Sequence, residues 1–172
     1  FKDINPNSFV VINNDDKYGL RLKKLTKAKI ITYGIENKAD VVARDIKLDS
    51  LWTEFRLLIP GREIKFRSQL LGKHNVYNLL ASFAWAFGAG IDISIIKSSL
   101  GGLAFVPGRL QRIDCQGDFS VFVDYAHTED ALKNIIQTLR LLSKKRIIVV
   151  FGCGGERDKN KRPKMGRVVS QL

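Results

Sequence analysis

FSVFVDYAHTEDALKNIIQTLRLLSKKRIIVVFGCGGERDKNKRPKM, residues 119–165, carries the clearest folding pattern in the chain. Two apolar, β-rich runs, 120–123 and 146–151, flank a segment whose apolar residues recur at helical spacing. Both runs end in polar residues, DYAH after the first and GCGGERD after the second. The pattern predicts a βαβ unit. Because ligands bind beside the carboxyl ends of parallel strands, these polar segments are expected to meet at one edge of a sheet.

The second polar segment opens with a glycine loop, residues 152–155, directly after a predicted strand. A dinucleotide-binding fingerprint needs a third glycine at the position where this chain has Arg157. We therefore interpret the loop as a turn that binds a phosphate or a carboxylate. Arg157 and Arg162 suit that role because guanidinium groups form paired hydrogen bonds with carboxylates. Pro163 fits the first turn of a following helix, whose N-terminus also favours anions.

The first polar segment places Asp124 and His127 at the end of a predicted strand. One interpretation is that they bond the ribose or the phosphates of a nucleotide, since Asp accepts from hydroxyls and His donates. The other is structural: Asp124 or Thr128 caps the next helix, and Tyr125 packs. The pattern places no Ser or Cys nucleophile beside them, which disfavours a hydrolytic triad.

The N-terminal part of the chain predicts a further βαβ unit followed by antiparallel strands. An apolar run at 9–13 ends in NNDD, Asp16 is placed to cap a helix over 17–25, and 30–33 is the next predicted strand. Two or three antiparallel strands then follow, the last two joined by a Pro-Gly turn. They are expected over 41–48, 54–59 and 63–66.

Leu, Ala and aromatic residues over 76–87 predict a helix that is apolar nearly all round and therefore buried, and 94–100 predicts a shorter second helix. His74, Asn75 and Asn78 stand at the start of the first helix. Two interpretations are open for the asparagines. They cap the helix, or they recognise a planar base, because an amide presents a donor and an acceptor side by side.

A hinge is predicted at FVPGR, residues 105–109, because Pro107 and Gly108 interrupt regular structure. The pattern then changes from helical to β at 110–115. We therefore place a domain boundary near residue 107.

The formal net charge of +12 favours an anionic partner, such as a nucleotide, a nucleic acid or an acidic metabolite. No apolar run reaches the roughly 18 residues of a membrane-spanning helix. Cys115 and Cys153 have no metal-ligand spacing, which is typical of a reducing, cytoplasmic setting. The chain begins at Phe1 and ends inside a predicted helix, so we expect it to be part of a longer protein.

Five motifs in this order, VINNDD, HNVYN, VPGR, DYAHTEDAL and FGCGGERDKNKRPKMG, resemble those of the Mur ligase family, most closely its MurE branch. The resemblance covers nearly the whole chain. GCGG-x-RD-x-x-KRP-x-M is its most specific part, whereas MurC and cyanophycin synthetases share versions of DYAH. The chain departs from the usual pattern at Glu129, Glu156 and Leu110-Gln111.

The resemblance implies an α/β fold in two parts. Residues 1–106 would be the later part of a central ATP-binding domain whose P-loop lies upstream. Residues 107–172 would begin a Rossmann-like C-terminal domain, with the segment that selects the amino acid further downstream. The resemblance assigns no catalytic residue and no metal ligand to this chain, which is expected to be inactive alone.

The implied activity is ATP-dependent amide-bond formation in peptidoglycan synthesis, with Mg²⁺. The acceptor carboxylate belongs to UDP-MurNAc-L-Ala-D-Glu, and the amine belongs to a diamino acid. The GGERD form favours meso-diaminopimelate, with lysine as the alternative. The residues that match family positions are His74, Asn75 and Asn78 beside adenine, Arg109, Asp124 and His127 beside ribose and phosphates, and Arg157 and, more weakly, Arg162 beside the diamino acid.

A cytoplasmic monomer without a nucleic-acid or membrane partner is expected from this resemblance. Two alternatives stay open. One is another ligase of the same superfamily, MurC-like or cyanophycin synthetase-like. The other is a basic nucleic-acid-binding domain, prompted by the charge, although the basic residues are not interleaved with aromatic ones.

Overall fold

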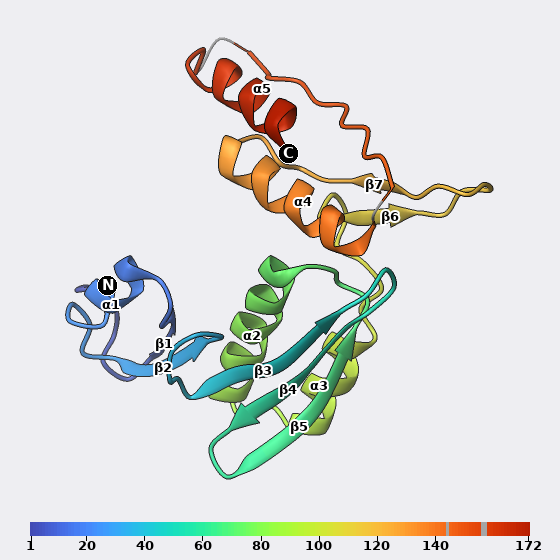
Figure 1. Ribbon diagram of the computed structural model, residues 1–172. Helices are drawn as coiled ribbons and strands as arrows, with labels where there is room; N and C mark the ends of the chain where they lie inside the picture. Colours follow the sequence, from blue (N-terminus) through green and yellow to red (C-terminus); the bar gives the residue numbers. More distant parts are fainter. Residues whose placement is uncertain (144, 156–157) are drawn as a thin grey trace. The chain divides into compact units, whose positions relative to one another are not determined.

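The structure is a computed structural model that describes residues 1–143, 145–155 and 158–172. The chain forms two compact units (Figure 1). Unit 1 comprises Phe1–Lys47 and Leu51–Ala104, and unit 2 comprises Leu48–Ser50 and Phe105–Leu172. The fold is mixed α/β, as the sequence predicts. In the described part of the chain, no helix is both long enough and apolar enough to cross a membrane.

Unit 1 begins with the predicted βαβ element. Strand β1 (Phe9–Asn13) and strand β2 (Lys29–Gly34) pair in parallel, and helix α1 (Lys17–Leu22) connects them. Asp16 caps α1 as expected, because its carboxylate accepts hydrogen bonds from the amides of Tyr18 and Gly19. The helix ends three residues earlier than predicted, at Leu22, because Lys24 and Leu25 bond carbonyls three residues back and tighten the chain into turns.

Three further strands complete a five-stranded sheet in the order β1-β2-β3-β4-β5. They are β3 (Val41–Leu48), β4 (Thr53–Ile59) and β5 (Arg62–Ser68). The antiparallel hairpin of β4 and β5 is confirmed, with Gly61 at φ +73° in its turn. Strand β3 pairs in parallel with β2, and its arrow opposes that of β4 in Figure 1. The sheet therefore changes from parallel to antiparallel at β3.

Helix α2 (Lys73–Gly88) packs on β1 and β2, and the shorter α3 (Ile93–Gly101) packs on α2 and β5. Val76, Leu80 and Phe83 of α2 are almost fully buried in the core of unit 1. The expectation that this helix is buried all round is wrong, because Trp85 is 59% exposed. Only one side of α2 faces the sheet, so the opposite stripe contacts solvent.

Unit 2 contains the hairpin of β6 (Gln111–Ile113) and β7 (Val121–Val123), followed by helices α4 (Glu129–Leu142) and α5 (Lys161–Gln171). Helices α4 and α5 pack side by side, as Figure 1 also shows. Leu132 and Ile136 of α4 and Met165 of α5 are buried. Unit 2 thus has a small apolar core.

The strand predicted at 146–151 is not formed. The prediction of a βαβ unit within residues 119–165 is therefore wrong in its last strand. Residues 146–151 have no strand assignment, and Val150 is 93% exposed. Extended backbone becomes a strand only when a neighbour satisfies its amides and carbonyls. Within the described residues, β7 pairs with β6 alone. The β-rich composition of 146–151 is therefore not enough to form a ladder here.

Candidate functional site

The first group of predicted site residues lies at the N-terminus of α2. Gly72 is the N-cap residue, so the interpretation of Asn75 and Asn78 as caps is wrong. Asn75 is 1% exposed; its Nδ2 donates to the Leu71 carbonyl at 2.8 Å, and its Oδ1 accepts from Asn78 Nδ2 at 3.1 Å. Asn75 therefore uses its amide inside the protein, whereas Asn78 lies on the exposed side of the helix.

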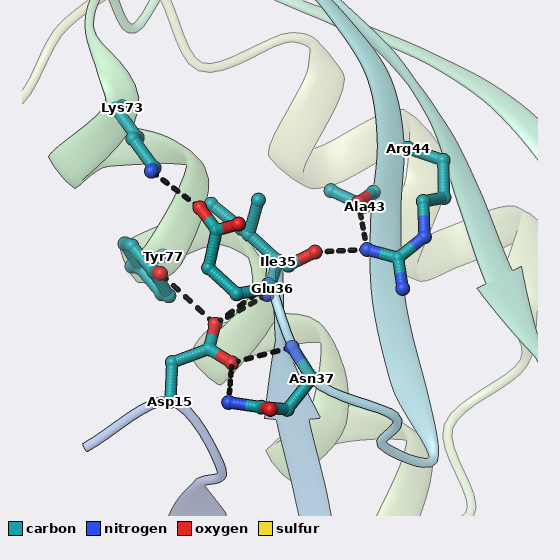
Figure 2. Close-up of polar contacts among 8 residues, drawn as sticks. All are labelled: Asp15, Ile35, Glu36, Asn37, Ala43, Arg44, Lys73 and Tyr77. Carbon is teal, nitrogen blue, oxygen red and sulfur yellow. Dashed lines mark hydrogen bonds and ion pairs between the residues drawn. The ribbon is translucent and has the colours of Figure 1, made fainter.

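The start of α2 is held by Asp15, which the sequence analysis did not single out (Figure 2). The Asp15 carboxylate accepts backbone hydrogen bonds from Ile35 at 2.6 Å, Glu36 at 3.1 Å and Asn37 at 2.8 Å. The Asn37 side chain donates a further bond at 3.0 Å, and the Tyr77 hydroxyl of α2 donates one at 2.9 Å. One carboxylate thus links the loops after β1 and β2 to α2.

These bonds set the ionisation of both partners. Burial by itself raises the pKa of Asp15. The hydrogen bonds from Ile35, Asn37, Glu36 and Tyr77 together outweigh burial and lower the pKa from 3.8 to about 2. Burial first, and then the bond to Asp15, raise the pKa of the Tyr77 phenol. Asp15 is consequently an anion and Tyr77 a neutral donor over the physiological range.

A second link reaches the same helix from the loop after β2. Lys73 Nζ lies 2.6 Å from Glu36 Oε1, and both side chains are exposed (Figure 2). The sequence contains one signal for the role of Asp15. Two successive aspartates follow β1, and a helix cap needs only one of them. Asp16 is the cap, and the other aspartate, Asp15, accepts amides from the loop after β2.

The second group of predicted residues lies in unit 2, where Asp124 follows β7. Its Oδ2 accepts from the Leu110 amide and its Oδ1 from the Ala126 amide, each at 2.7 Å. The Tyr125 amide donates to the Gly108 carbonyl at 2.8 Å. The DYAH segment is therefore bonded to the VPGR turn, and Asp124 and Arg109 belong to one local structure.

His127 and Arg109 present polar atoms at the surface of this structure. His127 Nδ1 lies 3.0 Å from the Tyr125 carbonyl, which favours the tautomer with the proton on Nδ1 and leaves Nε2 as an acceptor. The Arg109 side chain is exposed, and its amide bonds the Val106 carbonyl at 3.0 Å within the turn. This pair can contact an anionic or hydroxyl-bearing ligand.

The structural interpretation of this segment is correct only in part. Thr128 caps α4, because its hydroxyl accepts from the Ala131 amide at 3.2 Å. Asp124 is not the cap, and the prediction that Tyr125 packs is wrong, since this side chain is 75% exposed.

The glycine loop is held by Arg162, whose Nη2 donates to the Gly155 carbonyl at 2.6 Å. Helix α5 begins at Lys161, two residues before the expected start, so Pro163 lies in its first turn. Lys161 Nζ donates to the His127 carbonyl at 3.3 Å, which brings the start of α5 next to the DYAH segment. The predicted site residue Arg157 lies outside the described residues.

Neither unit offers an evident metal centre within the described ranges. A search of those residues finds no group of three or more His, Cys, Asp and Glu side chains that could hold an ion. Both Cys115 and Cys153 are free thiols, and Cys153 Sγ lies 3.5 Å from Met165 Sδ.

Comparison with known proteins identifies close relatives. The ligase named UDP-N-acetylmuramoyl-L-alanyl-D-glutamate--2,6-diaminopimelate ligase from Syntrophomonas wolfei is 41% identical over 164 residues, which cover 95% of this chain and 34% of that protein. The corresponding ligases of Bacillus velezensis and Clostridium acetobutylicum are 42% and 44% identical, over 94% of this chain and 33% and 34% of theirs. The chain thus spans about a third of the length of these curated relatives.

Solved structures agree with this result. A structure of a diaminopimelate ligase with the same name aligns at a TM-score of 0.69 and 34% identity, over 95% of this chain and 35% of that one. MurF from Acinetobacter baumannii aligns at 0.74 and 24% identity, over 81% of this chain and 31% of that one, which supports the fold alone.

Two family models match the chain in succession. Residues 1–86 match the Mur ligase middle domain, and residues 108–172 match the glutamate ligase domain of Mur ligases. The middle-domain match alone accounts for half of the sequence, and the second begins at Gly108, inside the VPGR turn. With the MurE-like motifs and the α/β fold in agreement, the chain belongs to the Mur ligase family.

Proposed function

We propose that this chain is part of an ATP-dependent ligase that joins meso-diaminopimelate to UDP-MurNAc-L-Ala-D-Glu. The observation that carries the proposal is 41–44% identity to diaminopimelate ligases over nearly the whole chain. In this reaction the glutamate carboxylate takes the terminal phosphoryl group of ATP and ADP leaves. The amine of the diamino acid then attacks the acyl phosphate, an amide bond forms, and phosphate leaves.

Each unit has a separate role in this proposal. Residues 1–106 form the later part of the ATP-binding central domain, and 107–172 begin the C-terminal domain. Asn78 is exposed and is therefore the better direct contact for adenine. The buried Asn75 orients the Asn78 side chain by accepting a hydrogen bond from its Nδ2. His74 stands in the same first turn of α2.

Arg109 and His127 suit the phosphates and the ribose, because one carries a permanent positive charge and the other offers Nε2 as an acceptor. Asp124 belongs to the same local structure, and each of its carboxylate oxygens accepts a backbone amide, from Leu110 and from Ala126. In this proposal the chain contributes to the nucleotide and diamino-acid sites, and Mg²⁺ is held by the phosphates together with groups of the longer protein.

The deciding experiment follows phosphate release by the full-length protein. The assay contains ATP, Mg²⁺ and UDP-MurNAc-L-Ala-D-Glu, and receives meso-diaminopimelate or lysine in turn. Release that requires both the precursor and diaminopimelate is expected. Release with lysine instead would correct the amino acid. No release with either, from a folded protein that still binds ATP, would favour another ligase of the superfamily.

Arg157 and Arg162 test the diamino-acid site within that assay. The proposal expects Arg157→Ala to raise the KM for the amino acid about tenfold or more, since a charged hydrogen bond contributes about 1.5–3 kcal/mol. The KM for ATP should change little. Arg162→Ala is the comparison variant, because the Arg162 guanidinium already donates to the Gly155 carbonyl and should affect the site only through the loop. Equal changes in both KM values for Arg157→Ala would reject the assignment.

A cytoplasmic location and a monomeric state complete the proposal. The precursor nucleotide and ATP are both cytoplasmic metabolites, and the free thiols of Cys115 and Cys153 suit a reducing compartment.

A further inference from the structure

The VPGR turn holds Leu110 in a conformation that L-residues disfavour. Leu110 has φ +46°, and the preceding Gly108 has φ +68°. Glycine adopts a positive φ without cost, but leucine does not. Something in unit 2 must therefore hold the backbone of Leu110, whose side chain is buried.

Asp124 supplies that restraint. Its Oδ2 accepts the Leu110 amide at 2.7 Å, and its Oδ1 is fixed by the Ala126 amide at the same distance. Both carboxylate oxygens are thus fixed by hydrogen bonds, so the carboxylate can restrain the backbone of Leu110. The neighbouring bond from the Tyr125 amide to the Gly108 carbonyl, 2.8 Å, ties the other end of the turn to the same segment.

Arg109 lies between these two attached residues. Because Gly108 and Leu110 are both hydrogen-bonded to residues directly after β7, the Asp124–Leu110 and Tyr125–Gly108 bonds set the backbone direction at Arg109. The Arg109 side chain itself is exposed. A change in the Asp124 bond would therefore redirect the Arg109 guanidinium without touching it.

We propose that Asp124 is a positioning residue, which clamps the VPGR turn through Leu110 and thereby aims Arg109 at an anionic group of the nucleotide. This inference rests on the proposed function for its ligand, but the clamp itself does not. It differs from a direct role of Asp124 on the ribose, in which the carboxylate acts on the nucleotide independently of Arg109.

Hydrogen exchange of the full-length protein without ligands tests the clamp. Asp124→Asn replaces one acceptor oxygen by a donor, so exchange in peptides covering 108–111 should accelerate about tenfold or more. Asp118→Asn is the matched control, since Asp118 lies on the connection between β6 and β7 but pairs with Lys145 at the surface. It should leave those peptides unchanged. Equal exchange in wild type and Asp124→Asn would overturn the clamp.

A double-mutant cycle tests the action through Arg109. Phosphate release is compared for wild type, Arg109→Ala, Asp124→Asn and the double variant. If Asp124 acts through Arg109, the double variant should match Arg109→Ala within about twofold in kcat/KM. Losses that multiply would show that Asp124 acts on the nucleotide directly, and would reject the positioning role.

Two further outcomes are distinguishable. If Asp124→Asn unfolds unit 2, exchange will rise throughout α4 as well; Asp124→Glu then serves, because it keeps the charge but moves the carboxylate by one methylene. It should still accelerate exchange at 108–111. If the wild-type protein releases no phosphate, the proposed function fails, while the exchange comparison still confirms or rejects the clamp.

Discussion

Asp15 in unit 1 and Asp124 in unit 2 use the same local device in different surroundings. Each follows a β-strand closely, and each carboxylate accepts backbone amides from a segment distant in sequence. Asp15 accepts three such amides and two side-chain donors beside a well-packed core. Asp124 accepts two amides next to a short hairpin whose Val121 and Val123 are exposed.

This difference indicates two different roles for a strand-end carboxylate. The partners of Asp15 lie in the loop after β2 and in α2, so the network joins the ends of elements that pack on one another. The partners of Asp124 are Leu110, directly after the VPGR turn, and Ala126, in the DYAH segment itself. Its hydrogen bonds therefore fix the local backbone conformation and bury little surface. We therefore expect Asp15 to matter most for stability and Asp124 to matter most for ligand geometry.

Asp15→Ala should give the largest loss of stability. It leaves three backbone amides and the Tyr77 hydroxyl without their acceptor, so the unfolding free energy of unit 1 should fall by about 2–4 kcal/mol. Hydrogen exchange of β2 and α2 in the full-length protein measures this loss. The adjacent Asp16→Ala is the control; it removes only the α1 cap and should cost about 1 kcal/mol. Similar losses for both would contradict the special status of Asp15.

The pH dependence of that stability sharpens the contrast. The pKa of Asp15 is about 2 in the folded protein against 3.8 as its ordinary value, so its stabilisation is complete above about pH 4 and is lost as the pH falls towards 2. After allowance for the solvent that reaches this half-buried carboxylate, the difference amounts to about 1–2 kcal/mol.

Pulse proteolysis with pepsin in urea, at a series of pH values between 4 and 2, is suited to this measurement. The gap in stability between wild type and Asp15→Asn should narrow as the pH falls, because protonated Asp15 resembles the amide. A gap that stays constant through this range would show that the Asp15 network does not depend on charge.

The same comparison shows what local sequence can predict. The alternating pattern of β4 and β5, the Pro-Gly turn and the Asp16 cap were all predictable, because each depends on neighbours within a few residues. The partners of Asp15 lie 20 to 62 positions along the chain, so no local spacing reveals them. Strand β3 was placed correctly, but its parallel pairing with β2 is a tertiary property.

Predictions failed where the hydrogen-bond partner of a residue depends on the tertiary structure and not on the local sequence pattern. The run 146–151 has strand composition, yet strand formation depends on a neighbour that composition does not specify. The position of Asn75 at a helix start predicts a cap; instead its amide donates to the Leu71 carbonyl and accepts from Asn78. The sequence predicts both Asp124 and Arg109 as site residues, but only the structure shows that Asp124 is hydrogen-bonded to Leu110, directly after Arg109.

Thr128→Ala tests whether the stability of unit 2 resides in its helices and not in the Asp124 turn. Loss of the α4 cap should lower the local stability of α4 by about 1 kcal/mol. Thr128→Ser keeps the hydroxyl and should be close to wild type. Hydrogen exchange across α4 measures both. If Thr128→Ala left exchange in α4 unchanged, or if Thr128→Ser accelerated it as much as Thr128→Ala, the stability of unit 2 would not depend on this cap.

The Lys73–Glu36 pair should have the smallest effect, although its 2.6 Å separation is the same as that of the Ile35–Asp15 bond. Both side chains are more than half exposed, so solvent screens the attraction and ordering them costs entropy. A double-mutant cycle with Lys73→Met and Glu36→Gln should give a coupling below about 1 kcal/mol that shrinks further in high salt. Hydrogen exchange in α2 measures it. Coupling as large as the loss in Asp15→Ala would mean that distance, and not the number of buried donors, sets the strength of these links to α2.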